Sequence, residues 1–299
     1  MKKIILALGV GSALLFSCKE KPPYIELTAT QSTATKVDTT YVLATVPAAD
    51  PHNILFENFT GASCSNCPAA HDILNTLESS NPGRINIVSL YIKDFSQTTP
   101  PPGAKFDFRT DGATSIMTSV YTVVAAMPCA GIDRLQLGDI SYGSDYLIGR
   151  DVWNTIVPTR LSVVDSVNLA LTSTYNAATR NATVNFKVTY LQPVATLQNF
   201  SIVVVEDSFV DKQEYPTYVD TAYHFNDIYR GSVTSGSLGE PILSTLAVKE
   251  KGRVYDVTYT YKVDAAWNPA HCKLVGFVHT GSANGGKIVY QSTQAKLVN

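Results

Sequence analysis

The sequence feature that most constrains this chain is the pair Cys64 and Cys67, which stands between a short apolar run and a helical pattern. The apolar run covers residues 53–59 and predicts a compact buried strand. Pro68 suits the first turn of a helix, where a missing backbone N–H costs little. One apolar helix face then follows, formed by Ile73, Leu74 and Leu77. The sequence therefore predicts a strand that delivers two cysteines to a helix N-terminus, where unpaired N–H groups and the helix dipole stabilise a thiolate.

The segments that follow extend this unit. Residues 85–92 predict a second buried strand, so the strand–helix–strand order favours a parallel pair with a right-handed crossover. Pro128 stands just ahead of a short strand at 130–135, and residues 145–157 predict a closing helix. This order is similar to that of thioredoxin folds, which keep a cis-proline at the corresponding place. We therefore predict an α/β thioredoxin-like domain over residues 51–159.

The hydrophobic pattern of the sequence changes after Arg160. Apolar and polar residues alternate in several short segments, which is the pattern of half-buried strands. Six or so such segments in residues 160–299 predict an all-β, immunoglobulin-like sandwich domain. A chain of 299 residues is long enough for both domains.

The N-terminus has the features of an export signal. Residues 1–17 combine two lysines with an apolar stretch too short to span a bilayer, and they end in a lipobox-like sequence before Cys18. We expect Cys18 to be lipidated and residues 18–50, rich in Thr, Ala, Pro and Ser, to form a tether. An ordinary cleaved signal with a chance cysteine is the alternative. Export implies an oxidising compartment, in which disulfides form.

Composition excludes several classes of function. The net charge of -2 gives no electrostatic case for nucleic acid as a partner. No phosphate-binding loop, Ser/His/Asp triad or spaced carboxylate pair stands out, so hydrolase and kinase functions have no support, and no cofactor is expected. The aromatic-rich connection at 206–250 is expected to pack against its own chain, although it could bind a peptide or glycan.

Three interpretations of the cysteine pair are open. In thiol–disulfide exchange, Cys64 would attack, Cys67 would resolve the mixed disulfide, and backbone beside Pro128 would pair with a substrate chain. In the second, the pair forms a structural disulfide. In the third, a metal cluster of zinc or copper would use Cys64, Cys67, His71 and Cys129. The plainer expectation for His71 is a solvated helix residue.

Other residues near the pair depart from the usual thioredoxin site. Ser63 stands where thioredoxin usually has a tryptophan, and Ser65-Asn66 replaces the usual Gly-Pro. Cys129 follows Pro128 directly and would bring a third sulfur near the pair. Cys272 lies at the start of an apolar strand and is expected to be a buried inert thiol, with a disulfide to Cys129 as the alternative.

Several stretches together carry a family resemblance. They are the lipobox, residues 57–61 followed by Cys64-x-x-Cys67-Pro68, Met127-Pro128 before Asp133-Arg134, and residues 223–225 before Tyr229-Arg230. With them, the chain resembles the Omp28-related outer-membrane lipoproteins of Bacteroidetes over most of its mature length. The resemblance implies a thioredoxin-like domain joined to a β-sandwich and held at the outer membrane by lipid, but it implies little about activity.

Two functions follow as hypotheses. The first is a lipid-anchored thiol–disulfide oxidoreductase that acts on the thiols or disulfides of exported proteins. The alternative is a non-enzymatic outer-membrane or surface lipoprotein, an adhesion or assembly module that binds another envelope protein and has a structural disulfide. Both place the protein in the cell envelope, facing either the periplasm or the surface, and bound to the membrane through Cys18.

Overall fold

The computed structural model describes residues 25–26, 34–137, 140–281 and 287–299, and these contain seventeen strands and three α-helices. The predicted lipidation site, Cys18, lies outside these ranges. The helices are α1 (Cys67–Ser80), α2 (Asp111–Ile116) and α3 (Trp153–Leu161). The strands are β1 (Ile25–Glu26), β2 (Thr35–Val42), β3 (Ile54–Phe59), β4 (Ile85–Leu90), β5 (Phe106–Asp107), β6 (Cys129–Ile132), β7 (Ile148–Gly149), β8 (Val167–Asn176), β9 (Asn181–Tyr190), β10 (Gln198–Glu206), β11 (Phe209–Glu214), β12 (Val219–Phe225), β13 (Ile228–Ser232), β14 (Glu240–Pro241), β15 (Arg253–Lys262), β16 (Cys272–Thr280) and β17 (Val289–Lys296).

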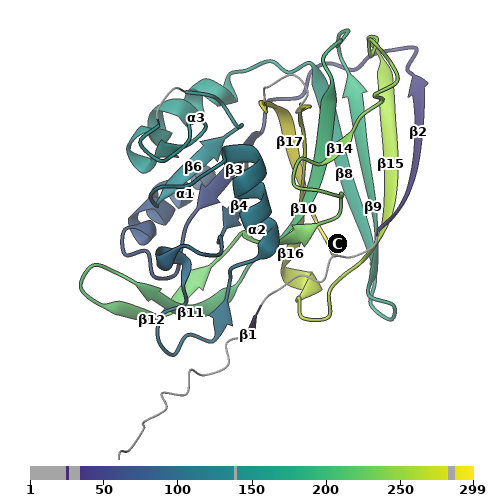
Figure 1. Cartoon of the computed structure of the whole chain (residues 1–299). Coiled ribbons are helices and arrows are strands. Elements are labelled where there is room, and N and C mark those ends of the chain that lie inside the picture. Colours follow the sequence, from purple (N-terminus) through teal and green to yellow (C-terminus); the bar gives the residue numbers. More distant parts are fainter. Residues whose placement is uncertain (1–24, 27–33, 138–139, 282–286) are drawn as a thin grey trace, which may run out of the picture.

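Most of these strands belong to two sheets (Figure 1). A nine-stranded mixed sheet has the order β17-β16-β10-β13-β4-β3-β6-β7, with β14 paired to β10. A four-stranded antiparallel sheet has the order β2-β15-β9-β8. The smaller sheet packs on the β10–β16 part of the larger one, while α1 and α3 pack beside β3 and β4. The result is a two-layer β-structure at one end and a helix-on-sheet structure at the other.

The predicted α/β thioredoxin-like fold followed by an all-β immunoglobulin-like sandwich is wrong. The described residues are mainly β-structure in several sheets, and β13 from the second half pairs with β4 from the first within one sheet. At that junction the Ser89 amide donates to the Asp227 carbonyl over 2.8 Å. The physical reason is that an apolar run indicates a buried strand but does not encode which strand lies beside it.

Several local predictions are confirmed. Strands β3 and β4 are parallel neighbours, every residue of both is buried, and α1 begins at Cys67 with Pro68 in its first turn. Helix α2 continues as a π-helix over Met117–Tyr121, so this helical stretch spans residues 111–121. The closing helix predicted at 145–157 is shorter and lies later, since residues 148–149 form β7 and α3 covers Trp153–Leu161. None of the helices in the described ranges is long and apolar enough to cross a membrane.

The Asp133 side chain joins three parts of the structure. Its carboxylate accepts hydrogen bonds from the Leu55 amide on β3 (2.9 Å), from His52 (2.8 Å) and from Arg160 of α3 (2.8 Å). Its backbone carbonyl accepts a bond from the Val289 amide of β17 over 2.9 Å. Asp133 is fully buried and has a φ of 48°, a left-handed conformation that Asp tolerates better than most residues.

A second buried ion pair lies next to it. The Glu57 carboxylate accepts two bonds from the Arg134 guanidinium, each 2.8 Å long, and one from the Tyr121 hydroxyl over 2.5 Å. The Arg134 guanidinium also lies 4.9 Å from the centre of the Phe277 ring. Because Glu57 is on β3 and Phe277 on β16, this pair links distant strands of the larger sheet.

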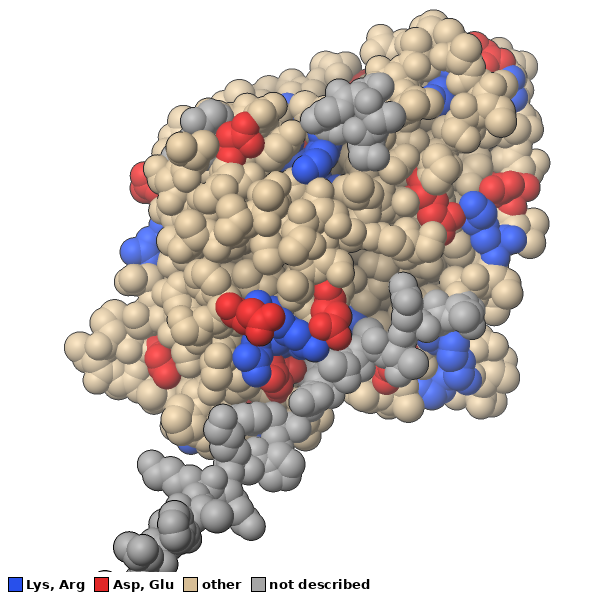
Figure 2. Space-filling view, in the orientation of Figure 1, with Lys and Arg blue, Asp and Glu red and all other residues tan. Residues whose placement is uncertain are grey.

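The space-filling surface agrees with the low charge content of the sequence. Figure 2 shows that Lys, Arg, Asp and Glu on this face gather in small groups of mixed sign around a broad uncharged area. A face of this kind has no extended positive patch of the type that binds nucleic acid.

The His52 site predicts a pH dependence of stability. Burial favours the neutral ring, but hydrogen bonds to Asp133 and Asp165 outweigh it and raise the pKa of His52 from 6.5 to about 9. The stabilisation is therefore complete below pH 6.5 and is lost as pH rises through 9. We expect the free energy of unfolding to fall by on the order of 1–3 kcal/mol across this range in denaturant titrations.

The variant His52→Gln is the control for this prediction. Its amide stays neutral at every pH, so the variant should be less stable at low pH and should lose this part of the pH dependence. An unchanged slope of stability against pH in the variant would contradict the assignment to His52.

Candidate functional site

The cysteine pair lies where the sequence predicts it, at the start of α1. Cys64 and Cys67 form a disulfide, and neither residue is exposed to solvent. The chain leaves β3 at Phe59 and turns at Gly61, where a Cβ atom would lie 2.1 Å from the Gln97 carbonyl oxygen. Glycine is therefore required at this close backbone approach, and the turn fixes the entry into α1.

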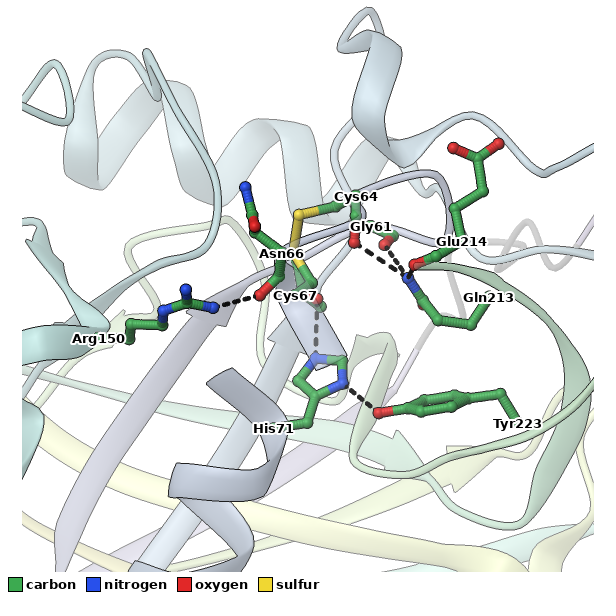
Figure 3. Close-up of a disulfide and its surroundings, with 10 residues drawn as sticks. Gly61, Cys64, Asn66, Cys67, His71, Arg150, Gln213, Glu214 and Tyr223 are labelled. Atoms are coloured by element: carbon green, nitrogen blue, oxygen red, sulfur yellow. Dashed lines mark hydrogen bonds between the residues drawn. A yellow bond between two sulfur atoms is a disulfide. The ribbon is translucent and has the colours of Figure 1, made fainter. Parts of the chain in front are cut away.

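The hairpin of β11 and β12 is bonded to the loop that leads into this disulfide. The Gln213 side-chain amide of β11 donates to the Cys64 carbonyl over 3.1 Å and to the Gly61 carbonyl over 3.3 Å (Figure 3). The Glu214 amide donates to the Ala62 carbonyl over 2.8 Å. Gln213 itself is fully buried. The hairpin thus covers the loop that contains Cys64 and holds it through backbone acceptors.

His71 ties the other strand of the hairpin to α1. Its Nδ1 lies 2.6 Å from the Tyr223 hydroxyl of β12, and its Nε2 lies 2.8 Å from the Thr60 hydroxyl (Figure 3). Burial lowers the pKa of His71 to about 4, so the ring is neutral at physiological pH. The expectation of a solvated helix residue therefore does not describe His71, which bridges two elements.

Cys129 begins β6, the strand beside β3, and Pro128 directly precedes it. The Met127–Pro128 peptide bond is cis, and Cys129 at the start of β6 pairs with Phe59 of β3. Burial raises the pKa of the Cys129 thiol, so it stays protonated. Cys129 belongs to the same apolar cluster as Cys64 and Cys67. The roles of Cys64, Cys67 and Pro128 in exchange remain predictions.

Three of the four proposed metal ligands are bonded to other groups of the protein. The sulfurs of Cys64 and Cys67 are bonded to each other, and both ring nitrogens of His71 have hydroxyl partners. Within the residues that the structure describes, no group of three His, Cys, Asp or Glu side chains is arranged to hold a metal ion. Cys129 and Cys272 are free buried thiols, as expected for Cys272, and they are not joined to each other.

The functional residues that sequence reasoning missed are Gln213, Glu214 and Tyr223. They belong to the aromatic-rich connection, which packs against its own chain as expected. Gln213 contacts Cys64 across 149 positions of sequence. The one local signal is a polar residue in a strand whose alternate positions are buried, and that signal does not identify its partner.

Comparisons with known proteins place the chain among envelope proteins. A family model described as "Outer membrane protein Omp28" matches residues 116–299, a range that includes Pro128 and the β11–β12 hairpin but not the disulfide. No curated protein matches the chain.

The chain aligns with two solved structures at low sequence identity. HBP35 of Porphyromonas gingivalis has a TM-score of 0.63 and 12% identity, with 84% of this chain and 77% of that one covered. A crystal structure of a protein from Agrobacterium tumefaciens has a TM-score of 0.47 and 12% identity, with 84% and 96% covered. At this identity, the first similarity shows a shared fold alone.

The hairpin contacts predict the effect of a single substitution. Gln213→Glu keeps the side-chain length but replaces the amide donor with acceptors that face the Gly61 and Cys64 carbonyls. We expect a loss of about 1–3 kcal/mol in hairpin stability. Hydrogen exchange in residues 209–225 should become faster, and reduction of the disulfide by a small thiol should accelerate about five- to thirtyfold.

Thr217→Ala, at the exposed tip of the same hairpin, is the matched control and should leave both rates unchanged. Equal exchange rates in Gln213→Glu and wild type would show that Gln213 does not hold the hairpin to the cysteine loop.

Proposed function

Since the chain belongs to the outer membrane protein Omp28 family, we propose that it is a non-enzymatic protein of the cell envelope, an adhesion or assembly module. In this proposal the Cys64–Cys67 disulfide is structural, the lipid anchor is Cys18, and the partner is another envelope protein.

The complete burial of the disulfide is the observation that supports this proposal best. Exchange begins when a thiolate reaches a disulfide sulfur, so its rate depends on access. Cys64 and Cys67 have no exposed surface, and the loop between Gly61 and Cys64 is bonded to Gln213 of the hairpin. The sulfurs lie in an apolar cluster with Phe59, Met127 and Cys129, so a substrate thiolate could reach them only if this part of the structure opened.

The surrounding contacts give the disulfide a structural role. It joins the first turn of α1 to the preceding loop, and that loop is bonded to the hairpin through Ser63, whose hydroxyl donates to the Glu214 carboxylate over 3.1 Å. On its other side, the Arg150 guanidinium donates to the Asn66 carbonyl over 2.6 Å (Figure 3). Because α1 lacks a side-chain cap at Asn66, the disulfide and these contacts hold the helix start in its place.

Thiol–disulfide exchange is the second candidate. It is favoured by the cis Met127–Pro128 bond beside a Cys-x-x-Cys pair at a helix N-terminus. The two candidates differ in what must happen to the disulfide, because exchange requires Cys64 to become an accessible thiolate while a structural bond stays closed.

A reduction experiment on the folded full chain separates the two. The chain is incubated with reduced glutathione, alkylated and analysed by mass spectrometry at Cys64 and Cys67. We expect both to stay unlabelled, with a reduction potential below about −300 mV, whereas the same treatment in denaturant labels them. Rapid native labelling, or mixed disulfides trapped by Cys67→Ser, would support exchange and contradict the proposal.

The double variant Cys64→Ser/Cys67→Ser tests the same point in cells. Loss of so short a disulfide loop should lower the free energy of unfolding by about 2 kcal/mol. The variant should nevertheless reach the outer membrane and complement a deletion strain as wild type does. Failure to complement, at a normal protein level, would show that the sulfur chemistry is needed for function.

A further inference from the structure

Strand β2 forms a long open edge of the four-stranded sheet. It is the terminal strand in the order β2-β15-β9-β8, and all eight of its residues are exposed (Figure 1). It has no proline, and its pairing with β15 has no bulge. Among the described strands, the other sheet ends differ, since β7 has two residues and β8 packs against β17. Long, flat edges of this kind are templates for pairing with another strand.

The backbone groups on that edge can be assigned from two hydrogen bonds. The Leu43 amide donates to the Gly252 carbonyl, and the Val263 amide donates to the carbonyl of Arg180, the residue just before β9. With the observed registers, odd-numbered residues of β2 therefore bond to β15. The N–H and C=O groups that face outward belong to the even-numbered residues Lys36, Asp38, Thr40 and Val42.

Two side chains of opposite charge, Lys36 and Asp38, flank Val37 on this edge and lie 3.6 Å apart within the chain. Val37 itself is 75% exposed, and it stands between a cation at Lys36 and an anion at Asp38. Lys36 also lies 2.9 Å from the Glu240 carboxylate, and Asp38 accepts a bond from the Tyr255 hydroxyl. The Lys36 side chain is still 35% exposed, and the Asp38 side chain is 44% exposed.

We propose that β2 pairs antiparallel with β2 of a second copy of the chain, about a two-fold axis at Val37. In this register Lys36 of each copy lies opposite Asp38 of the other, and both contribute outward-facing amides and carbonyls. Opposite charges in directly facing positions stabilise a strand pair, and a two-fold axis forms the favourable contact twice. The two smaller sheets then join into one continuous sheet across both copies.

Charge complementarity selects this register over its neighbour. An axis at Thr39 would also bring outward-facing residues together, but it would place Lys36 opposite Val42 and Asp38 opposite Thr40. That arrangement forms no ion pair across the interface. The edge is thus self-complementary at Val37, which favours a second copy over an unrelated strand.

Cysteine cross-linking tests the register directly. In the proposed dimer, Val37 faces itself in a pair that is not hydrogen-bonded, with Cα atoms about 4.5 Å apart, which suits a disulfide. Thr39 is displaced from its own copy by four residues, or roughly 13 Å, so it cannot form one. On mild oxidation of the full chain in detergent, Val37→Cys should form a covalent dimer, and Thr39→Cys and wild type should not.

Charge reversal tests the ion pairs. Lys36→Glu and Asp38→Lys should each weaken self-association at least about tenfold in sedimentation velocity, because each places like charges in facing positions. A mixture of the two variants should form heterodimers, since every facing pair is then of opposite sign, and the double variant should dimerise again. Lys296→Glu, on the exposed part of β17, makes the same charge change away from this edge and should leave association unchanged.

Several outcomes would overturn the proposal. They are a wild-type chain that stays monomeric at every concentration, a cross-link through Thr39→Cys in place of Val37→Cys, and a cross-link from Val37→Cys to another protein alone. Association that is insensitive to both charge reversals would place the interface elsewhere.

Discussion

The buried Asp133 carboxylate is the interaction on which the arrangement of the larger sheet depends. It is bonded at once to β3, to His52 ahead of that strand and to Arg160 on α3, while its carbonyl is bonded to β17. A buried carboxylate is costly unless its acceptors are filled, so these donors must come together for the fold to form. The three donors to the carboxylate lie between residues 52 and 160, and the bond from Val289 of β17 to the Asp133 carbonyl joins the second half of the chain to them.

Contacts between the two halves of the chain also affect the chemistry of the cysteine pair. A Cys-x-x-Cys at the start of a helix is a reactive arrangement when its first sulfur meets solvent. In this chain both cysteines are fully buried, and the hairpin of the second half holds their loop through the bond from Gln213 to the Cys64 carbonyl. The reactivity expected from one short motif is therefore controlled by a segment about half the chain away, and the folded protein presents a closed bond.

Local reasoning succeeded where the signal was local. The strand before the cysteine pair and the helix that follows it are each indicated by a run of a few residues, while the parallel neighbour at β4 and the cis bond before Pro128 follow from the order of elements. It failed where the answer depended on partners, as with the overall fold, with His71 and with Gln213. A neutral histidine between Thr60 and Tyr223 has the same sequence context as a solvated one.

The sequence by itself determined which segments are buried strands, where the first helix begins and that two cysteines stand at its start. These features depend on hydrophobic periodicity and on backbone preferences, which act over one or two turns of chain. Only the tertiary structure decided that β13 lies beside β4, that a hairpin is bonded to the cysteine loop and that β2 is left with an open edge. The reason is that strand partners are chosen by long-range packing and hydrogen bonding, which no local pattern encodes.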